Sequence, residues 1–163
     1  MSGPMEDDTN RRSGHFPPFG LGAELEADVQ CAMTNSSPVL ITAPSDVASM
    51  LASRIHRHGL NRRSPFLTVD CSRISLPEQL EVAFDAAGPR GTVFLRDVDR
   101  LSPSLQAFLS VKIVPLGVRV MAATSVSLLR ESILGTFEER LFYRLNQIHI
   151  VAPQSEEYSG AAC

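Results

Sequence analysis

The stretch that decides the fold is TVFLRDVDRLSPSLQAFL, residues 92–109. Its first four residues form an apolar and β-branched run, which is typical of a strand buried on both faces of a sheet. Two carboxylates, Asp97 and Asp99, follow the strand. Ser102 and Pro103 then provide a helix N-cap and a first helical residue that lacks an N–H donor. The next apolar side chains recur at helical spacing: Leu105, Phe108 and Leu109. These residues predict one strand–helix unit.

The same alternation continues on both sides of this unit. Upstream we expect a helix over 23–33, a strand over 38–42, a helix over 46–58, a strand over 65–69 and a helix from Ser75. Downstream we expect a strand over 118–123, a helix over 126–134, a short helix to about 144 and a strand near 148–150. Short strands that alternate with helices predict a three-layer αβα sandwich around a five-stranded, mainly parallel sheet. Ile148 and Ile150 alternate with polar residues, which indicates an edge strand.

Several local features of the helices can also be predicted. The helix over 46–58 presents one apolar stripe: Val47, Met50, Leu51 and Ile55. Two helices show the spacing of a capping box, in which a Ser or Thr precedes a Glu by three residues. The pairs are Ser75 with Glu78 and Thr136 with Glu139.

Length and composition exclude several classes of protein. The chain has 163 residues, enough for one domain, and 44% of them are apolar, as in a folded globular protein. Its net charge is −3, which gives no electrostatic reason for nucleic acid as the main partner. No apolar run approaches the roughly 18 residues that cross a membrane. The polar, acidic start does not resemble a secretory signal.

The cysteines, the histidines and the chain ends indicate the cellular setting and the extent of the domain. Cys31, Cys71 and Cys163 lie far apart, match neither a disulfide framework nor a metal motif, and indicate a reduced, cytoplasmic setting. His56 and His58 are two residues apart, so they point to different helix faces and make a poor metal pair. We expect no metal site. Residues 1–20 and 154–163 read as polar tails around a core over 21–153.

In an open parallel sheet, ligands bind at the carboxyl ends of the strands. The loop after the first strand has neither the glycines nor the Lys of a phosphate cradle. Pro44 removes an N–H donor, and Asp46 adds a negative charge. An anion could still bind at the start of the next helix, or Ser45 or Asp46 could cap that helix instead. The only Lys of the chain, Lys112, lies far along the sequence.

Three other groups of polar residues have two interpretations each. Asp97 could hold Mg²⁺, or it could pair with a nearby Arg at the surface. Thr124 could bond to a ligand, or it could cap the following helix. Arg140 and Arg144 lie on one helical face, where they could meet the phosphate of a neighbouring molecule or form weak surface pairs.

Several segments resemble the sigma-54 interaction domain, the AAA+ ATPase module of bacterial enhancer-binding transcription activators. Residues 91–98 (GTVFLRDV) resemble its Walker B strand, and residues 119–124 (RVMAAT) resemble its sensor I strand. Residues 137–146 (FEERLFYRLN) resemble its arginine-finger segment and are the most specific match. The resemblance spans roughly 21–153 and implies a fold of the P-loop NTPase type.

The chain departs from the family at the positions that handle phosphate. The family's glycine-rich loop ends in Gly-Lys, whereas this loop is one residue shorter and has Ala48 or Ser49 in place of Lys. Arg96 stands where the family has the Walker B Asp, and Asp97 where it has Glu. Glu138 replaces the first finger arginine, and Arg144 keeps the second. The resemblance is therefore to a degenerate and truncated member.

Other family parts are missing from this sequence. The insertion that carries the GAFTGA loop is reduced to about fifteen residues between Ser75 and Gly91, without that motif. The helical lid and the DNA-binding helix-turn-helix are also absent. We therefore expect neither direct contact with the sigma factor nor DNA binding.

These observations favour a non-catalytic interaction module in transcriptional regulation, with no cofactor and with a protein partner, either a second copy or a related AAA+ regulator. The alternative is a weak or atypical ATPase that uses ATP and Mg²⁺. A third possibility is a remnant or a different small signalling domain. The candidate nucleotide site comprises Ser45, Asp46, Ala48, Ser49, Asp97 and Thr124. No catalytic residue is expected, and Asp97 would have that role in an active enzyme. The candidate interface comprises Arg140 and Arg144.

Overall fold

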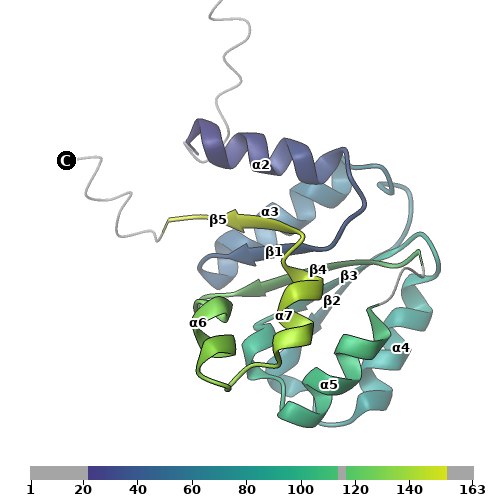
Figure 1. Cartoon of the computed structure of the whole chain (residues 1–163). Coiled ribbons are helices and arrows are strands. Elements are labelled where there is room, and N and C mark those ends of the chain that lie inside the picture. Colours follow the sequence, from purple (N-terminus) through teal and green to yellow (C-terminus); the bar gives the residue numbers. More distant parts are fainter. Residues whose placement is uncertain (1–21, 114–116, 154–163) are drawn as a thin grey trace, which may run out of the picture.

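The computed structural model of the chain describes residues 22–113 and 117–153, so the predicted tails lie outside the described residues. Strands and helices alternate along the chain as expected (Figure 1). The strands are β1 (Val39–Thr42), β2 (Phe66–Asp70), β3 (Thr92–Arg96), β4 (Arg119–Thr124) and β5 (Ile148–Val151). The helices are α2 (Ala23–Met33), α3 (Ser45–Arg57), α4 (Pro77–Ala87), α5 (Pro103–Lys112), α6 (Leu128–Ile133) and α7 (Glu139–Leu145), with short 3₁₀ turns η1 (Cys71–Arg73) and η2 (Val98–Arg100).

All five strands are parallel and lie in the order β2-β3-β4-β1-β5. Alternate residues of a strand face opposite sides of the sheet, so β1, β2, β3 and β4 contribute to two cores, whereas the buried residues of β5 contribute to one. One core joins the sheet to α2 and α3, and the other joins it to α4, α5 and α7 (Figure 1). Phe94, for example, belongs to the first core and Leu95 to the second. The predicted αβα sandwich with a five-stranded parallel sheet is confirmed.

Burial along the strands follows their position in the sheet. Every residue of the inner strand β4 is buried, whereas β5 lies at one edge and alternates between covered and exposed residues. Ile150 is fully buried, and its neighbour Val151 is 56% exposed. The edge position inferred from Ile148 and Ile150 is therefore confirmed.

The apolar stripe predicted for α3 is wrong in part. Met50 is 39% exposed, and the buried residues on this helix include Ala48, Leu51, Ala52 and Ile55. Small alanines let the helix approach the sheet closely, so the covered face is turned away from Met50. The prediction from apolar spacing favoured the large Met50 over the small Ala48 and Ala52, which are the buried residues.

Both predicted capping boxes are also wrong, whereas the cap at Ser102 is confirmed. Helix α4 begins at Pro77, and the Gln79 side chain accepts from the backbone amides of Ser75 (2.9 Å) and Leu76 (3.0 Å). Helix α7 is capped by Glu138, which accepts from the amide of Leu141 at 2.6 Å. The capping side chain of α4 lies one residue after the predicted Glu78, and the N-cap of α7 lies two residues after the predicted Thr136. Ser102 accepts from the amide of Leu105 at 3.4 Å.

Candidate functional site

Four of the candidate residues lie in the first two turns of α3, which follows the carboxyl end of β1: Ser45, Asp46, Ala48 and Ser49. Only two residues, Ala43 and Pro44, connect β1 to this helix. Ser45 and Ser49 are half-buried and Asp46 is exposed, but Ala48 is buried in the core with 1% exposure. The Ala48 amide bonds to the Pro44 carbonyl at 2.9 Å. Ala48 is therefore part of the packing beneath the site and does not face it.

Arg96 reaches across from the end of β3 to the first residue of α3. Its Nη2 donates to the Ser45 hydroxyl at 3.3 Å. Its Nε is buried and has no hydrogen-bond partner among the described residues. A helix N-terminus carries partial positive charge, so a guanidinium here adds to a positive potential. The arrangement places a fixed cation beside the start of α3.

Asp97 follows Arg96 in a left-handed backbone conformation, with φ 52° and ψ 52°. Such a conformation is uncommon for a residue other than glycine, and Asp and Asn tolerate it better than most. It lets the chain turn sharply from β3 into η2, where the Arg100 amide bonds to the Asp97 carbonyl at 2.9 Å. The half-buried Asp97 side chain thus lies next to Arg96 at the same edge of the sheet.

Thr124 at the end of β4 is buried and bonds to protein groups on both sides. Its hydroxyl donates to Asp99 Oδ1 at 2.8 Å and accepts from the amide of Val126 at 3.1 Å. The second interaction closes a turn before α6 and is not a helix cap. The N-cap of α6 is Ser127, which accepts from the Arg130 amide at 3.3 Å, so the capping role considered for Thr124 is wrong. Asp99 was not chosen as a site residue, although its place shortly after a buried strand was a usable signal. The structure joins Ser45 to Arg96, and Thr124 to Asp99.

A small hollow of about 230 Å³ opens beside these residues, lined by Thr42, Ala43, Pro44, Ser125, Val151, Ala152 and Pro153. Next to it, the Thr42 hydroxyl contacts His149 Nε2 at 2.9 Å across the β1–β5 pair. Partial removal of water lowers the pKa of His149, and the charge of Asp28 opposes this effect. His149 was missed from the sequence because pairing between distant strands creates the contact.

The two candidate interface arginines differ in their surroundings. Arg140 is exposed on α7. Arg144 is half-buried, and its Nη1 donates to the carbonyls of Ser110 and, at 3.5 Å, of Ile113. These carbonyls lie at the C-terminal end of α5, where a cation is stabilised by unpaired acceptors. Arg144 therefore holds α7 against α5.

Within 22–113 and 117–153, no cluster of three or more His, Cys, Asp or Glu side chains could hold a metal ion. The same residues contain no helix long and apolar enough to cross a membrane. Lys112 lies on α5, and its Nζ is 3.9 Å from Glu81 Oε1.

Comparison with known proteins gives the fold and the site a family context. Residues 21–154 match the family model of the sigma-54 interaction domain. The nitrogen fixation protein AnfA of Azotobacter vinelandii is 31% identical over 157 residues, covering 76% of this chain and 29% of AnfA. The transcriptional regulatory protein ZraR of Escherichia coli (strain K12) is 28% identical, covering 79% of this chain and 36% of ZraR. The chain thus spans about a third of the length of these relatives.

Solved structures agree on the fold. NtrX from Brucella abortus, in complex with ATP, has a TM-score of 0.67 at 22% identity and covers 91% of this chain and 40% of its own. The P-loop NTPase domain of the sigma-54 transport activator from E. coli has a TM-score of 0.58 at 19% identity, covering 72% of this chain and 98% of that domain. The sheet is thus of the P-loop NTPase type. With the family match over 21–154, the chain belongs to the sigma-54 interaction domain family, the domain of sigma-54-dependent transcriptional regulators.

Proposed function

We propose that this chain is a non-catalytic regulatory or protein-interaction module related to sigma-54-dependent regulators, and that it has lost ATP hydrolysis. The observation that carries this proposal is the bond between Arg96 Nη2 and the Ser45 hydroxyl at 3.3 Å. It fixes a cation at the place where the family resemblance implies a Mg²⁺-ordering carboxylate. A guanidinium repels Mg²⁺, so the metal that normally neutralises charge in phosphoryl transfer is disfavoured there.

The loop before α3 supports the same proposal. A phosphate cradle needs backbone amides that converge on oxygen, and a Lys that neutralises charge. Here Pro44 provides no amide, Ala43 donates its amide to the Thr124 carbonyl at 3.0 Å, and Ala48 is buried. The phosphate-loop Lys and the Mg²⁺-ordering carboxylate, which neutralise charge in a hydrolytic site, are thus both replaced in our proposal. We expect neither ATP nor Mg²⁺ to act as a cofactor.

One observation favours the alternative of weak, atypical MgATP binding. The hollow of about 230 Å³ lies at the carboxyl edge of the sheet, directly beside Pro44. In that case Asp97 would organise Mg²⁺, Thr124 would sense the phosphate, and Ser45, Asp46 and Ser49 would border it. Arg144 could act as a finger only after leaving the α5 carbonyls that it already contacts.

Calorimetry with MgATP distinguishes the two proposals. We expect no heat of binding at millimolar nucleotide and no phosphate release from the full chain. Asp97→Asn should behave identically. Saturable heat that Asp97→Asn reduces at least tenfold would overturn the proposed loss of the site and establish the alternative.

Our proposal includes a protein partner, either a second copy or a related AAA+ regulator, and assigns the chain to the cytoplasm, where such regulators act. The exposed Arg140 on α7 is the candidate contact. Direct sigma-factor contact and DNA binding are not part of the proposal. The test is sedimentation of the chain alone and with a related regulator. Arg140→Glu should weaken the association, whereas Arg130→Glu, on exposed α6, should not. Equal effects of both variants would show that Arg140 is not a specific contact with the partner.

A further inference from the structure

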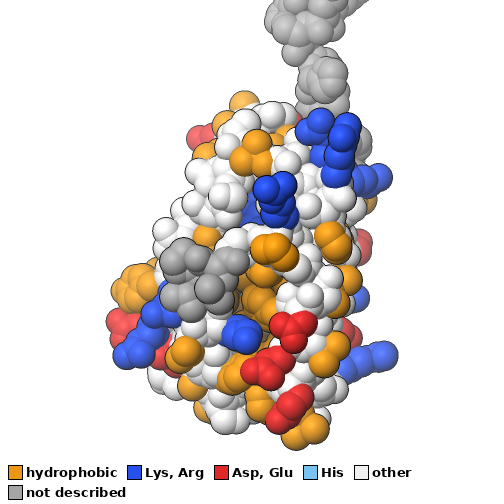
Figure 2. All heavy atoms as spheres, turned by 90° about the vertical axis from the view of Figure 1, so that its right-hand side faces the viewer, with side chains coloured by type: hydrophobic (Ala, Val, Ile, Leu, Met, Phe, Trp, Pro, Cys, Tyr) orange, Lys and Arg blue, Asp and Glu red, His pale blue; other side chains and the backbone are white. Residues whose placement is uncertain are grey.

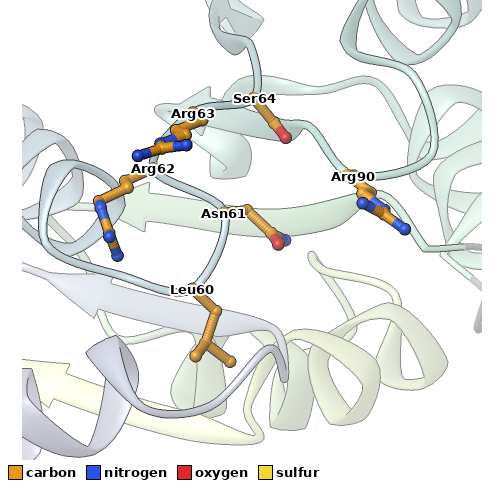
Figure 3. A pocket seen from close by; sticks show the side chains of 6 residues that line it. All are labelled: Leu60, Asn61, Arg62, Arg63, Ser64 and Arg90. Atoms are coloured by element: carbon orange, nitrogen blue, oxygen red, sulfur yellow. The ribbon is translucent and has the colours of Figure 1, made fainter.

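A second polar hollow lies at the opposite end of the sheet from the candidate nucleotide site. It encloses about 320 Å³ and is lined by Leu60, Asn61, Arg62, Arg63, Ser64 and Arg90 (Figure 3). These residues come from two turns, one between α3 and β2 and one between α4 and β3. Because both turns precede strands, the hollow lies at the N-terminal ends of the sheet, on the right-hand side of Figure 1. Neither the family resemblance nor the proposed nucleotide chemistry uses this end.

Each turn packs closely against the preceding helix at a glycine. In the first, a Cβ on Gly59 would lie 2.6 Å from the Ile55 carbonyl, and the Ser64 amide bonds to the Asn61 carbonyl at 2.9 Å. In the second, a Cβ on Gly91 would lie 2.0 Å from the Ala87 carbonyl. These close approaches leave no room for a side chain at Gly59 or Gly91.

A buried histidine joins the two turns. His56 Nε2 lies 2.9 Å from the Ser64 carbonyl, and Nδ1 lies 3.1 Å from the Thr92 hydroxyl. The carbonyl can only accept, so Nε2 carries the proton and Nδ1 accepts from Thr92. This neutral tautomer satisfies every group without a charge. The Thr92 amide also bonds to the Pro65 carbonyl at 2.9 Å. The hollow is thus built on a preorganised frame.

The three arginines around the hollow have no ion pair within the described part of the chain. Arg62, Arg63 and Arg90 are all exposed, and the recorded salt bridges involve other basic residues. Figure 3 shows Arg62 and Arg63 to one side of Asn61 and Arg90 to the other. Lys and Arg side chains also gather in the upper part of the face in Figure 2. This positive charge is concentrated on a chain whose net charge is −3.

The composition of the hollow indicates what could occupy it. Leu60 is 64% exposed at its rim, which suits a ligand with apolar side chains. Guanidinium groups on both sides of Asn61 suit carboxylates spaced along a chain, because Arg forms bidentate pairs with each.

We propose that this hollow docks an acidic peptide segment of a partner protein, one in which Glu or Asp residues alternate with leucine-sized side chains. The inference rests on the proposed function only in taking the partner to be a protein. It uses neither Arg96 nor α7, so its failure would leave the MgATP and Arg140 tests unchanged.

The test measures fluorescence anisotropy of labelled peptides with the full chain. The probe is (Glu-Glu-Leu)₄, and its uncharged control is (Gln-Gln-Leu)₄. The variant Arg63→Gln/Arg90→Gln is compared with Arg73→Gln/Arg130→Gln, which removes the same charge from two exposed residues elsewhere. Thermal unfolding of each variant checks that it is folded.

We expect the acidic probe to bind the wild type, the control peptide to bind at least tenfold more weakly, and binding to weaken from 50 to 300 mM salt by roughly tenfold. Arg63→Gln/Arg90→Gln should weaken binding about tenfold, and the control variant less than about twofold. Equal binding of both peptides, or equal effects of both variants, would overturn the proposal. So would tighter binding of a twelve-residue oligo-dT strand, or displacement by micromolar inorganic phosphate, since these indicate nucleic acid or a small anion.

Discussion

Arg96 and Ser45 are 51 positions apart in the sequence, yet the guanidinium of the first donates to the hydroxyl of the second at 3.3 Å. This bond joins the end of β3 to the start of α3. It involves Arg96, which stands where the sequence resemblance implies a carboxylate. Substituting Arg96 therefore tests how much this contact contributes to stability.

Substitution Arg96→Met should leave the chain at least as stable as the wild type. The Arg96 Nε is buried without a partner among the described residues, and its charge lies beside a positive helix end. Methionine keeps most of the aliphatic packing, so we expect a gain between zero and about 1 kcal/mol in the free energy of unfolding. Urea denaturation measures it. A loss above about 1 kcal/mol would mean that the bond to Ser45 contributes more than the unpaired Nε and the charge beside the helix end cost together.

Thr124→Val should destabilise the chain. The substitution leaves Asp99 Oδ1 and the Val126 amide without the buried hydroxyl, at an expected cost of about 1–3 kcal/mol. Thr68→Val on the exposed face of β2 is the matched control and should change stability by less than about 0.5 kcal/mol. Thermal unfolding of both variants tests this, and equal shifts would contradict a structural role for Thr124.

Arg144→Ala should cost stability, whereas Arg140→Ala should not. The Arg144 guanidinium satisfies carbonyls at the end of α5, so its loss should lower the free energy of unfolding by about 1–3 kcal/mol. Arg140 is exposed, and its removal should be nearly neutral. Chemical denaturation distinguishes the two. Similar small effects would show that Arg144 is free to serve another role.

Stability should fall as the pH is lowered from 7.5 to 5.5. Burial lowers the pKa of His56 and of His149, with Arg119 adding to the effect on His56. The unfolded chain, with pKa values near 6.5, then binds more protons than the native state below that pH. The stabilisation is therefore complete above about pH 6.5 and is lost as pH falls toward the native values.

Two variants assign this pH dependence. His56→Gln should reduce the slope of unfolding free energy against pH, because only His149 then contributes. His149→Gln should likewise reduce the slope, because of the two only His56 then contributes. A slope that survives in His56→Gln at full size would show that His56 does not carry it.

The elements of the fold were predictable because they depend on local patterns. Continuous apolar runs such as 92–95 identified the inner strands, and the alternation around Ile150 identified the edge. The helix caps were less predictable, since each depends on the residue at which the helix begins, and α4 and α7 begin later than the Ser and Thr signals indicate. The buried face of α3 depended on Ala48 and Ala52, whose small size gives little signal in an apolar count.

The site depended on contacts between distant segments, which one sequence does not contain. Nothing near Arg96 in the sequence indicates that it meets Ser45, and nothing near Arg144 indicates that it holds α5. The strand-end rule nevertheless pointed to the edge of the sheet where Ser45, Arg96 and Thr124 lie. It gave no indication of the arginine hollow, because that hollow lies at the other end of the strands.

The two-residue connection between β1 and α3 limits how point substitutions could build a phosphate cradle in this loop. The Ala43 amide extends the β1–β4 ladder by one bond to the Thr124 carbonyl, and α3 begins two residues later. A longer, glycine-rich loop would have to break that bond or move the helix out of its core. Restoring a lysine at position 48 or 49 would therefore change charge without creating a cradle. A phosphate cradle at this position would therefore need an inserted segment and not only point substitutions.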